Sequence, residues 1–260
     1  MASALRLLEV KGLSRHFGGI RAMDNMELRV EQGEIVGIIG PNGAGKSTFF
    51  SVVSGHQKAT AGRVVFGGID VTSWRPHRIA RRGLIRGFQA NVLFREHTVL
   101  WNVLVGCQIP VGFTLLGTLF NVTSTLAKQK QALEQAYEIL DFVKMAEFSE
   151  QRASVLSYGH QRILSLAISL AARPRLLLLD EPTTGMDADQ LETMLNLITK
   201  VRDSGVTILL VEHNMRAIFK LCDRIAVMRA GTKLADGTPA EIKSNQEVIG
   251  AYLGGGAVDA

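Results

Sequence analysis

A glycine-rich segment, GPNGAGKST at residues 40–48, constrains this chain more than any other feature. It matches the pattern GxxxxGK[ST], in which glycines let the backbone turn so that several N–H groups point at phosphate oxygens. Lys46 would reach the β- and γ-phosphates, and Ser47 can hold Mg²⁺. An apolar run at 34–40 precedes the segment and a helical pattern at 47–55 follows it, in the order strand, loop, helix. The sequence therefore predicts a nucleotide site made by Gly40, Pro41, Asn42, Gly43, Ala44, Gly45, Lys46, Ser47 and Thr48.

Length and composition are those of a well-packed globular chain. With 260 residues, 47% of them apolar and 20% charged, the chain can bury a full core and is not disordered. Its two cysteines, Cys107 and Cys222, are far apart and outside any CxxC spacing, so we expect neither a disulfide framework nor a zinc site. This cysteine usage favours a reducing compartment. The amino-terminal residues contain no apolar run of signal-peptide length, so we expect no secretion.

The net charge of +5 raises the question of a nucleic-acid or anionic partner. The segment RPHRIARRGLIR at 75–86 contains five arginines and no acid, and it accounts for the whole excess. A local cluster of this kind is more often a solvated helix face than a nucleic-acid groove. We therefore expect no nucleic-acid partner.

Two further apolar runs predict buried strands, LLLLD at 176–180 and VTILLVE at 206–212, with a helical pattern between them. Such alternation predicts an α/β fold with a parallel sheet. Earlier segments, LLEVKGLSRHF, NMELRVEQG and GRVVFGGIDV, alternate polar and apolar residues around glycines, which predicts an antiparallel β region on one flank. Because ligands bind beyond the carboxyl ends of parallel strands, Gly40, Asp180 and His213 should meet at one edge.

Between residues 90 and 155 the pattern becomes helical, most clearly at 128–145, which predicts an inserted helical lobe. Residues 98–127 contain no charged side chain. Glycines, a proline and polar amides interrupt this stretch, whereas a membrane span needs about 20 mostly apolar residues in one helix. We interpret it either as lobe core or as an apolar surface that docks on a partner.

Two adjacent acids, Asp180 and Glu181, end the four-leucine strand. An ordinary acid pair would belong to a solvated turn, but this pair is predicted to lie beside a phosphate loop. Asp180 suits a carboxylate linked to Mg²⁺, and Glu181 suits a residue that orients or deprotonates the attacking water. The segment SYGHQRILSLAISLAA predicts a helix capped by Ser157, whose amino-terminal end can also receive a phosphate.

These residues resemble the ATP-binding subunits of ABC transporters along nearly the whole chain. Gln89, in GFQANVLF, matches the loop glutamine that touches Mg²⁺ and water and faces the transmembrane partner. The segment LSYGHQR at 156–162 stands where the LSGGQ signature belongs, and TGMD at 184–187 matches the loop that crosses the dimer. His213 corresponds to the switch histidine near the γ-phosphate, and Phe17 to the aromatic residue that stacks on adenine.

Two residues depart from the family signature. Tyr158 replaces its first glycine, which is common in related importer subunits, and His160 replaces its glutamine. Gly159, where the backbone must approach phosphate most closely, is kept. The resemblance thus implies nucleotide contacts from Ser157, Gly159 and His160. Two interpretations of the His160 imidazole stay open: it faces the nucleotide of the partner subunit, or it caps its own helix.

The resemblance implies one ABC ATPase domain over residues 1–260. The P-loop NTPase core would comprise 1–89 and 156–260, and the helical subdomain 90–155. ATP and Mg²⁺ are the implied cofactors, with Ser47, Gln89 and Asp180 at the metal. The implied catalytic residues are Glu181, His213 and Gln89.

The segments FGGIRAMDNM, LFREHTVLWNVLVG and EVIGAYLG look most like the ATPase subunits of branched-chain amino acid, amide or urea importers. Such a subunit lies peripherally on the cytoplasmic face of the cell membrane. Its implied partners are a second ATPase subunit, either this chain or a paralogue, two transmembrane permease subunits and, indirectly, a solute-binding protein.

Three other functions compete with import. Lipopolysaccharide-export ATPases are close neighbours of these importers in sequence. Nucleic-acid-linked ABC ATPases usually carry a long coiled-coil insertion or two cassettes, and these residues show neither. A non-catalytic nucleotide sensor would not need both Glu181 and His213.

Overall fold

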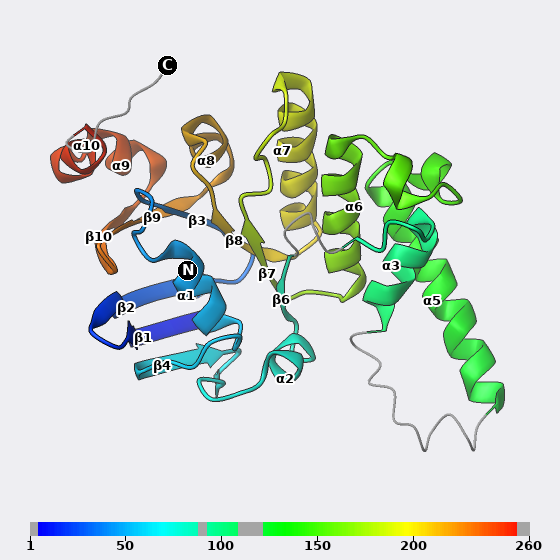
Figure 1. Cartoon of the computed structure of the whole chain (residues 1–260), viewed down its shortest axis with the longest axis horizontal. Helices are drawn as coiled ribbons and strands as arrows, with labels where there is room; N and C mark the ends of the chain where they lie inside the picture. Colours follow the sequence, from blue (N-terminus) through cyan, green and yellow to red (C-terminus); the bar gives the residue numbers. More distant parts are fainter. Residues whose placement is uncertain (1–4, 88–92, 109–121, 254–260) are drawn as a thin grey trace.

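The structure is a computed structural model that describes residues 5–87, 93–108 and 122–253. In these ranges, two β-sheets and the helices that cover them form the fold (Figure 1). The strands are β1 (Arg6–Phe17), β2 (Ile20–Glu31), β3 (Ile35–Ile39), β4 (Ala61–Phe66), β5 (Ile69–Asp70), β6 (Leu84–Arg86), β7 (Leu176–Asp180), β8 (Thr207–Val211), β9 (Arg224–Arg229) and β10 (Thr232–Gly237). The helices are α1 (Lys46–Val53), α2 (Pro76–Ala80), α3 (Val99–Cys107), α5 (Val122–Phe142), α6 (Tyr158–Ala171), α7 (Ala188–Asp203), α8 (Met215–Leu221), α9 (Pro239–Ser244) and α10 (Gln246–Leu253), with 3-10 turns at Ala146–Phe148 and Ala153–Val155.

The larger sheet has the strand order β10-β9-β3-β8-β7-β6. All of its pairs are parallel except β9 with β10. Every residue of β3 and β8 is buried, which explains why both strands read as continuous Ile, Val and Leu runs. Val211 is in register with both Ile38 and Asp180, so β3, β8 and β7 end at nearly the same level. The predicted parallel sheet is confirmed.

The smaller sheet has the order β2-β1-β4-β5 and is antiparallel throughout, as the alternating pattern predicts. One core cluster joins it to the larger sheet. Phe49 and Phe50 of α1 lie in that cluster with Met23 and Met26 of β2 and Leu178 of β7. The helix that begins at the glycine-rich loop is therefore held from both sheets.

The chain between β6 and β7 is helical in its described part, as expected. Helices α3 and α5 pack against each other and against α6, away from the smaller sheet (Figure 1). Val99, Val103 and Cys107 of α3 are buried, so this part of the charge-free stretch is lobe core. Residues 109–121 of that stretch lie outside the described residues. In the described ranges no helix has the length and apolar content that a membrane span requires.

The crossing of α3 and α6 depends on a glycine. A Cβ at Gly106 would lie 2.3 Å from the carbonyl oxygen of Ile168 and 2.8 Å from the Cβ of Ala171. We predict that Gly106→Ala lowers the free energy of unfolding by about 1–3 kcal/mol, because overpacking at a tight contact forces the backbone apart. Chemical denaturation measures this.

Gly250 offers the matched control, since a Cβ there meets nothing within 4 Å in α10. Gly250→Ala should leave stability unchanged or raise it by up to about 1 kcal/mol, because alanine is the better helix former. Equal effects of the two substitutions would contradict the close-packing explanation.

Candidate nucleotide-binding and hydrolysis site

The loop at 40–48 leaves an uncapped helix end open to a ligand. Helix α1 begins at Lys46, and its N-cap residue Gly45 supplies no side-chain hydrogen bond. Within the described part of the chain, the amides of Gly43, Gly45, Lys46 and Ser47 find no acceptor. The first N–H groups of a helix carry partial positive charge and need acceptors. The loop is therefore suited to bind an anion.

Two glycines of this loop are required by their surroundings. A Cβ at Gly40 would lie 2.2 Å from the carbonyl oxygen of Met228, at the end of β9. Gly45 has φ +98°, and a Cβ there would lie 2.5 Å from the carbonyl oxygen of Ala22. Any larger residue would push the loop off the strand ends that carry it.

Lys46 lies inside the curve of the loop. Its Nζ donates hydrogen bonds to the carbonyl oxygens of Gly40 (2.6 Å) and Pro41 (3.1 Å). Burial lowers the pKa of its ammonium, and the nearby carboxylates of Glu181 and Asp180 partly oppose this shift. The structure thus places the lysine and both predicted acids in one electrostatic environment.

Asp180, at the end of β7, is almost fully buried and ion-paired. Its side chain is 4% exposed, and its Oδ2 accepts a hydrogen bond from Arg86 Nη2 at 3.0 Å. Sequence reasoning did not identify Arg86 as a site residue. The signal was present, since an arginine on a buried strand three residues before Gln89 needs a counter-charge.

Glu181 adopts an uncommon backbone conformation, with φ +49°. Its amide donates to the carbonyl oxygen of Val211, and the hydroxyl of Thr184 donates to its Oε2 at 3.3 Å. His213 Nδ1 lies 3.7 Å from its Oε1. Left-handed backbone at a non-glycine residue costs energy and concentrates at functional sites. The structure therefore brings Glu181 and His213 together. The carboxylate of Glu181 is half-exposed and lies between the ends of β7 and β8.

A buried carboxylate that the sequence analysis missed organises this edge. Glu212 is 1% exposed and accepts hydrogen bonds from the amide and the hydroxyl of Thr183. Its other oxygen accepts from the amides of His213 (3.1 Å) and Asn214 (3.3 Å). It therefore ties the loop after Glu181 to the loop that carries His213. An acid at the end of an all-apolar strand was the available signal.

The signature segment lies at the amino-terminal end of α6, as predicted. Ser157 is the N-cap, and its hydroxyl oxygen accepts from the His160 amide at 3.3 Å. The His160 ring also contacts this hydroxyl (3.0 Å) and packs against Phe148. These contacts agree with the interpretation in which the His160 imidazole caps its own helix. The amides of Tyr158 and Gly159 have no acceptor in the described ranges and stay available to a ligand.

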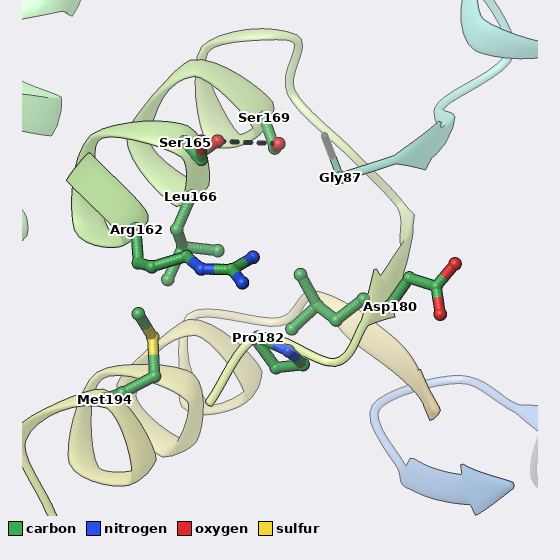
Figure 2. A pocket seen from close by; sticks show the side chains of 9 residues that line it. Gly87, Arg162, Ser165, Leu166, Ser169, Asp180, Pro182 and Met194 are labelled. Carbon is green, nitrogen blue, oxygen red and sulfur yellow. Dashed lines mark hydrogen bonds between the residues drawn. The ribbon is translucent and has the colours of Figure 1, made fainter. Parts of the chain in front are cut away.

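Tyr158 connects the signature to the loop at 184–187. A Cβ at Gly185 would lie 3.0 Å from its ring, and the Arg162 guanidinium donates two hydrogen bonds to its hydroxyl. Figure 2 shows Arg162 pointing into a pocket that α6 shares with β7, while the Asp180 carboxylate points away from it. The residue in place of the signature glycine is thus built into the local packing.

The remaining predicted residues are Phe17 and Gln89. Phe17 ends β1, is 41% exposed, and has the Arg15 guanidinium over its ring at 4.3 Å. An exposed aromatic ring on the smaller sheet is available for stacking. Gln89 lies outside the described residues, so its contacts stay a prediction.

Ser47 and Asp180 fit a Mg²⁺ site completed by phosphates. No group of three or more His, Cys, Asp and Glu side chains among the described residues can hold a metal alone. Mg²⁺ in phosphate-binding sites uses one or two carboxylates together with phosphate oxygens and water, so a hydroxyl and one carboxylate suit it.

Comparisons with known proteins agree with this geometry. The family described as "ABC transporter" matches residues 23–184, and one described as "Branched-chain amino acid ATP-binding cassette transporter" matches 232–258. The chain belongs to the ABC transporter ATP-binding cassette family. It is 39% identical over 249 residues to BraF of Pseudomonas aeruginosa and to LivG of Escherichia coli, covering 95% of this chain and 98% of each relative. Both are described as high-affinity branched-chain amino acid transport ATP-binding proteins.

Solved structures show the same fold. A nucleotide-free ATP-binding cassette from an ABC transporter superimposes with a TM-score of 0.84 at 30% identity, covering 95% of this chain and 99% of that one. A cassette in its ADP conformation gives a TM-score of 0.84 at 29% identity, covering 96% and 99%. The predicted family and fold class are confirmed.

The contacts of Glu212 predict an effect on stability. In Glu212→Gln an NH₂ group replaces one of the two carboxylate oxygens, and each of these oxygens accepts two hydrogen bonds. The buried groups that donate to the replaced oxygen would then face another donor. We expect the free energy of unfolding to fall by about 1–3 kcal/mol, the cost of unsatisfied buried groups. Denaturant titration measures the free energy of unfolding.

The half-exposed neighbour offers the control, since Glu181→Gln should change the free energy of unfolding by less than about 0.5 kcal/mol. A stable Glu212→Gln protein would contradict the role given to this carboxylate.

Proposed function

We propose that this chain is the ATP-hydrolysing subunit of an importer that moves branched-chain amino acids, or related amides or urea, across the cytoplasmic membrane. The observation that carries the ATPase part is the uncapped start of α1, with four free amides and Lys46, beside the two acids at the end of β7. A triphosphate supplies the anionic oxygens that such a loop lacks.

Each residue has a role that follows from its position. The loop amides and Lys46 hold the β- and γ-phosphates, and Phe17 stacks on adenine. Ser47, Asp180 and Gln89 are the residues assigned to Mg²⁺, which neutralises charge on those phosphates when bound.

Glu181 accepts or orients the proton of the attacking water, because its carboxylate is half-exposed at the strand end. His213, 3.7 Å from that carboxylate, acts beside it near the γ-phosphate. The strained backbone at Glu181 aims the carboxylate, and Glu212 fixes the two loops that flank it.

The assembly and the solute rest on the relatives. Ser157 and Gly159 would contact nucleotide bound to a second ATPase subunit, to which the amides of Tyr158 and Gly159, without an acceptor in the described residues, would donate, while the His160 ring caps its own helix. Both named relatives are described as branched-chain amino acid transport ATP-binding proteins, and the family matched at 232–258 is described as a branched-chain amino acid ATP-binding cassette transporter. Two permease subunits would complete the importer, and the chain would lie on the cytoplasmic face of the membrane.

Glu181→Gln tests the ATPase role directly. The substitution keeps the size of the side chain and removes its charge and basicity, so ATP affinity should stay within about twofold while turnover falls by about 10²–10⁴. Phosphate release and equilibrium ATP binding on the purified protein measure the two quantities. Turnover close to that of the wild type would remove Glu181 from the catalytic role.

Co-purification tests the partner assignment. Expressed with its neighbouring genes, the tagged chain should be recovered from detergent-solubilised membranes with hydrophobic permease subunits. Recovery with ribosomes or nucleic acid, and without permeases, would favour the nucleic-acid-linked ATPases instead.

A further inference from the structure

Arg86 links the two structural elements that carry the proposed Mg²⁺ residues. Its Nη2 donates to Asp180 Oδ2 at 3.0 Å, and its Nη1 donates to Ser51 Oγ at 3.1 Å. Ser51 in turn donates to the carbonyl oxygen of Ser47 at 2.8 Å. One guanidinium, on β6, therefore contacts both the carboxylate at the end of β7 and the first turns of α1.

Arg86 supplies the counter-charge of a buried acid, Asp180. The Asp180 side chain is 4% exposed and that of Arg86 is 22% exposed. A carboxylate this buried has lost most of its hydration and needs a charged hydrogen-bond partner to offset that loss. The other arginine of this region, Arg162, hydrogen-bonds Tyr158, and the Asp180 carboxylate points away from it (Figure 2). Among the described residues, only Arg86 forms an ion pair with Asp180.

The geometry points to Arg86 as a positioning residue of the metal site, which holds Asp180 and α1 in the relative placement that Mg²⁺ binding requires. This inference rests on the proposed function. Arg86 binds one carboxylate oxygen, and no residue in the described ranges hydrogen-bonds the other, Oδ1, so that it can face a cation; the bond from Nη1 to Ser51 fixes the guanidinium at a second point. A planar guanidinium offers two nitrogens in a fixed geometry, one for each acceptor, whereas an ammonium has a single nitrogen on a flexible stem.

Two effects of the guanidinium oppose each other. Its positive charge repels a nearby cation, but its hydrogen bonds orient the carboxylate that would bind the metal. Partners that orient metal ligands contribute tenfold to a hundredfold to metal affinity. The Asp180 side chain is 4% exposed, so its placement depends on the partner that holds it, and orientation should outweigh the repulsion. We therefore expect loss of Arg86 to weaken metal binding.

The experiment measures Mn²⁺ binding by electron paramagnetic resonance on the full chain with a saturating non-hydrolysable ATP analogue. Arg86→Gln should bind Mn²⁺ about 10- to 100-fold more weakly, while its affinity for the analogue without metal stays that of the wild type. Arg82→Gln is the matched control, because it removes an exposed arginine four residues away, and it should bind Mn²⁺ normally. Thermal unfolding is recorded for each variant.

Two more variants separate orientation from folding. Arg86→Lys keeps a charge beside Asp180 but replaces the two donating nitrogens with one on a flexible stem, so it should fold and still bind Mn²⁺ more weakly than the wild type. If Arg86→Gln does not fold, this variant decides alone. Ser51→Ala keeps the ion pair and should lose less affinity than Arg86→Gln.

Several results would overturn the inference. A folded Arg86→Gln protein with wild-type or tighter Mn²⁺ binding would show that the arginine is structural or competes with the metal, even if its melting temperature falls. Normal Mn²⁺ binding by Arg86→Lys, or equal losses in Ser51→Ala and Arg86→Gln, would also contradict it. A wild-type chain that binds no nucleotide-dependent Mn²⁺ would instead refute the proposed function.

Discussion

Parallel pairing of β3, β8 and β7 is the constraint on which the rest of the site depends. Because Val211 is in register with both Ile38 and Asp180, three strands end level with one another. The loop proposed to bind phosphate follows β3, Asp180 and Glu181 lie at the end of β7, and His213 follows β8. Since β3 and β8 are fully buried, their ends cannot shift without disrupting the core. The sheet thus converts three distant segments into one rigid edge.

Much of this arrangement could be predicted from the sequence. Apolar runs that end in glycine or acids identified β3, β7 and β8, and the GxxxxGK[ST] pattern located the start of α1. Ser157 was predicted as a helix cap from local residue types, and the structure confirms it. These features depend on short stretches of chain, where periodicity and capping preferences act directly.

The missed residues depend on contacts across the fold. Arg86 and Asp180 are 94 residues apart, and nothing in either segment alone identifies the other. Glu212 was overlooked beside the more familiar His213, although its four accepted hydrogen bonds hold the loops on both sides. Burial of a charged side chain becomes visible only when strands that are distant in sequence are paired. Such residues connect the elements that carry the site, while those found from the motifs would contact the nucleotide.

Hydrogen exchange at the amides of Gly43, Gly45, Lys46 and Ser47 is the most direct test of the central claim that the free amides at the start of α1 and in the loop before it bind phosphate. With Mg²⁺ and a non-hydrolysable ATP analogue, exchange of these amides should slow markedly, because each gains an acceptor. Adenosine at the same concentration, which lacks phosphates, should leave their exchange unchanged. Nucleotide binding without any protection of these amides would contradict the account.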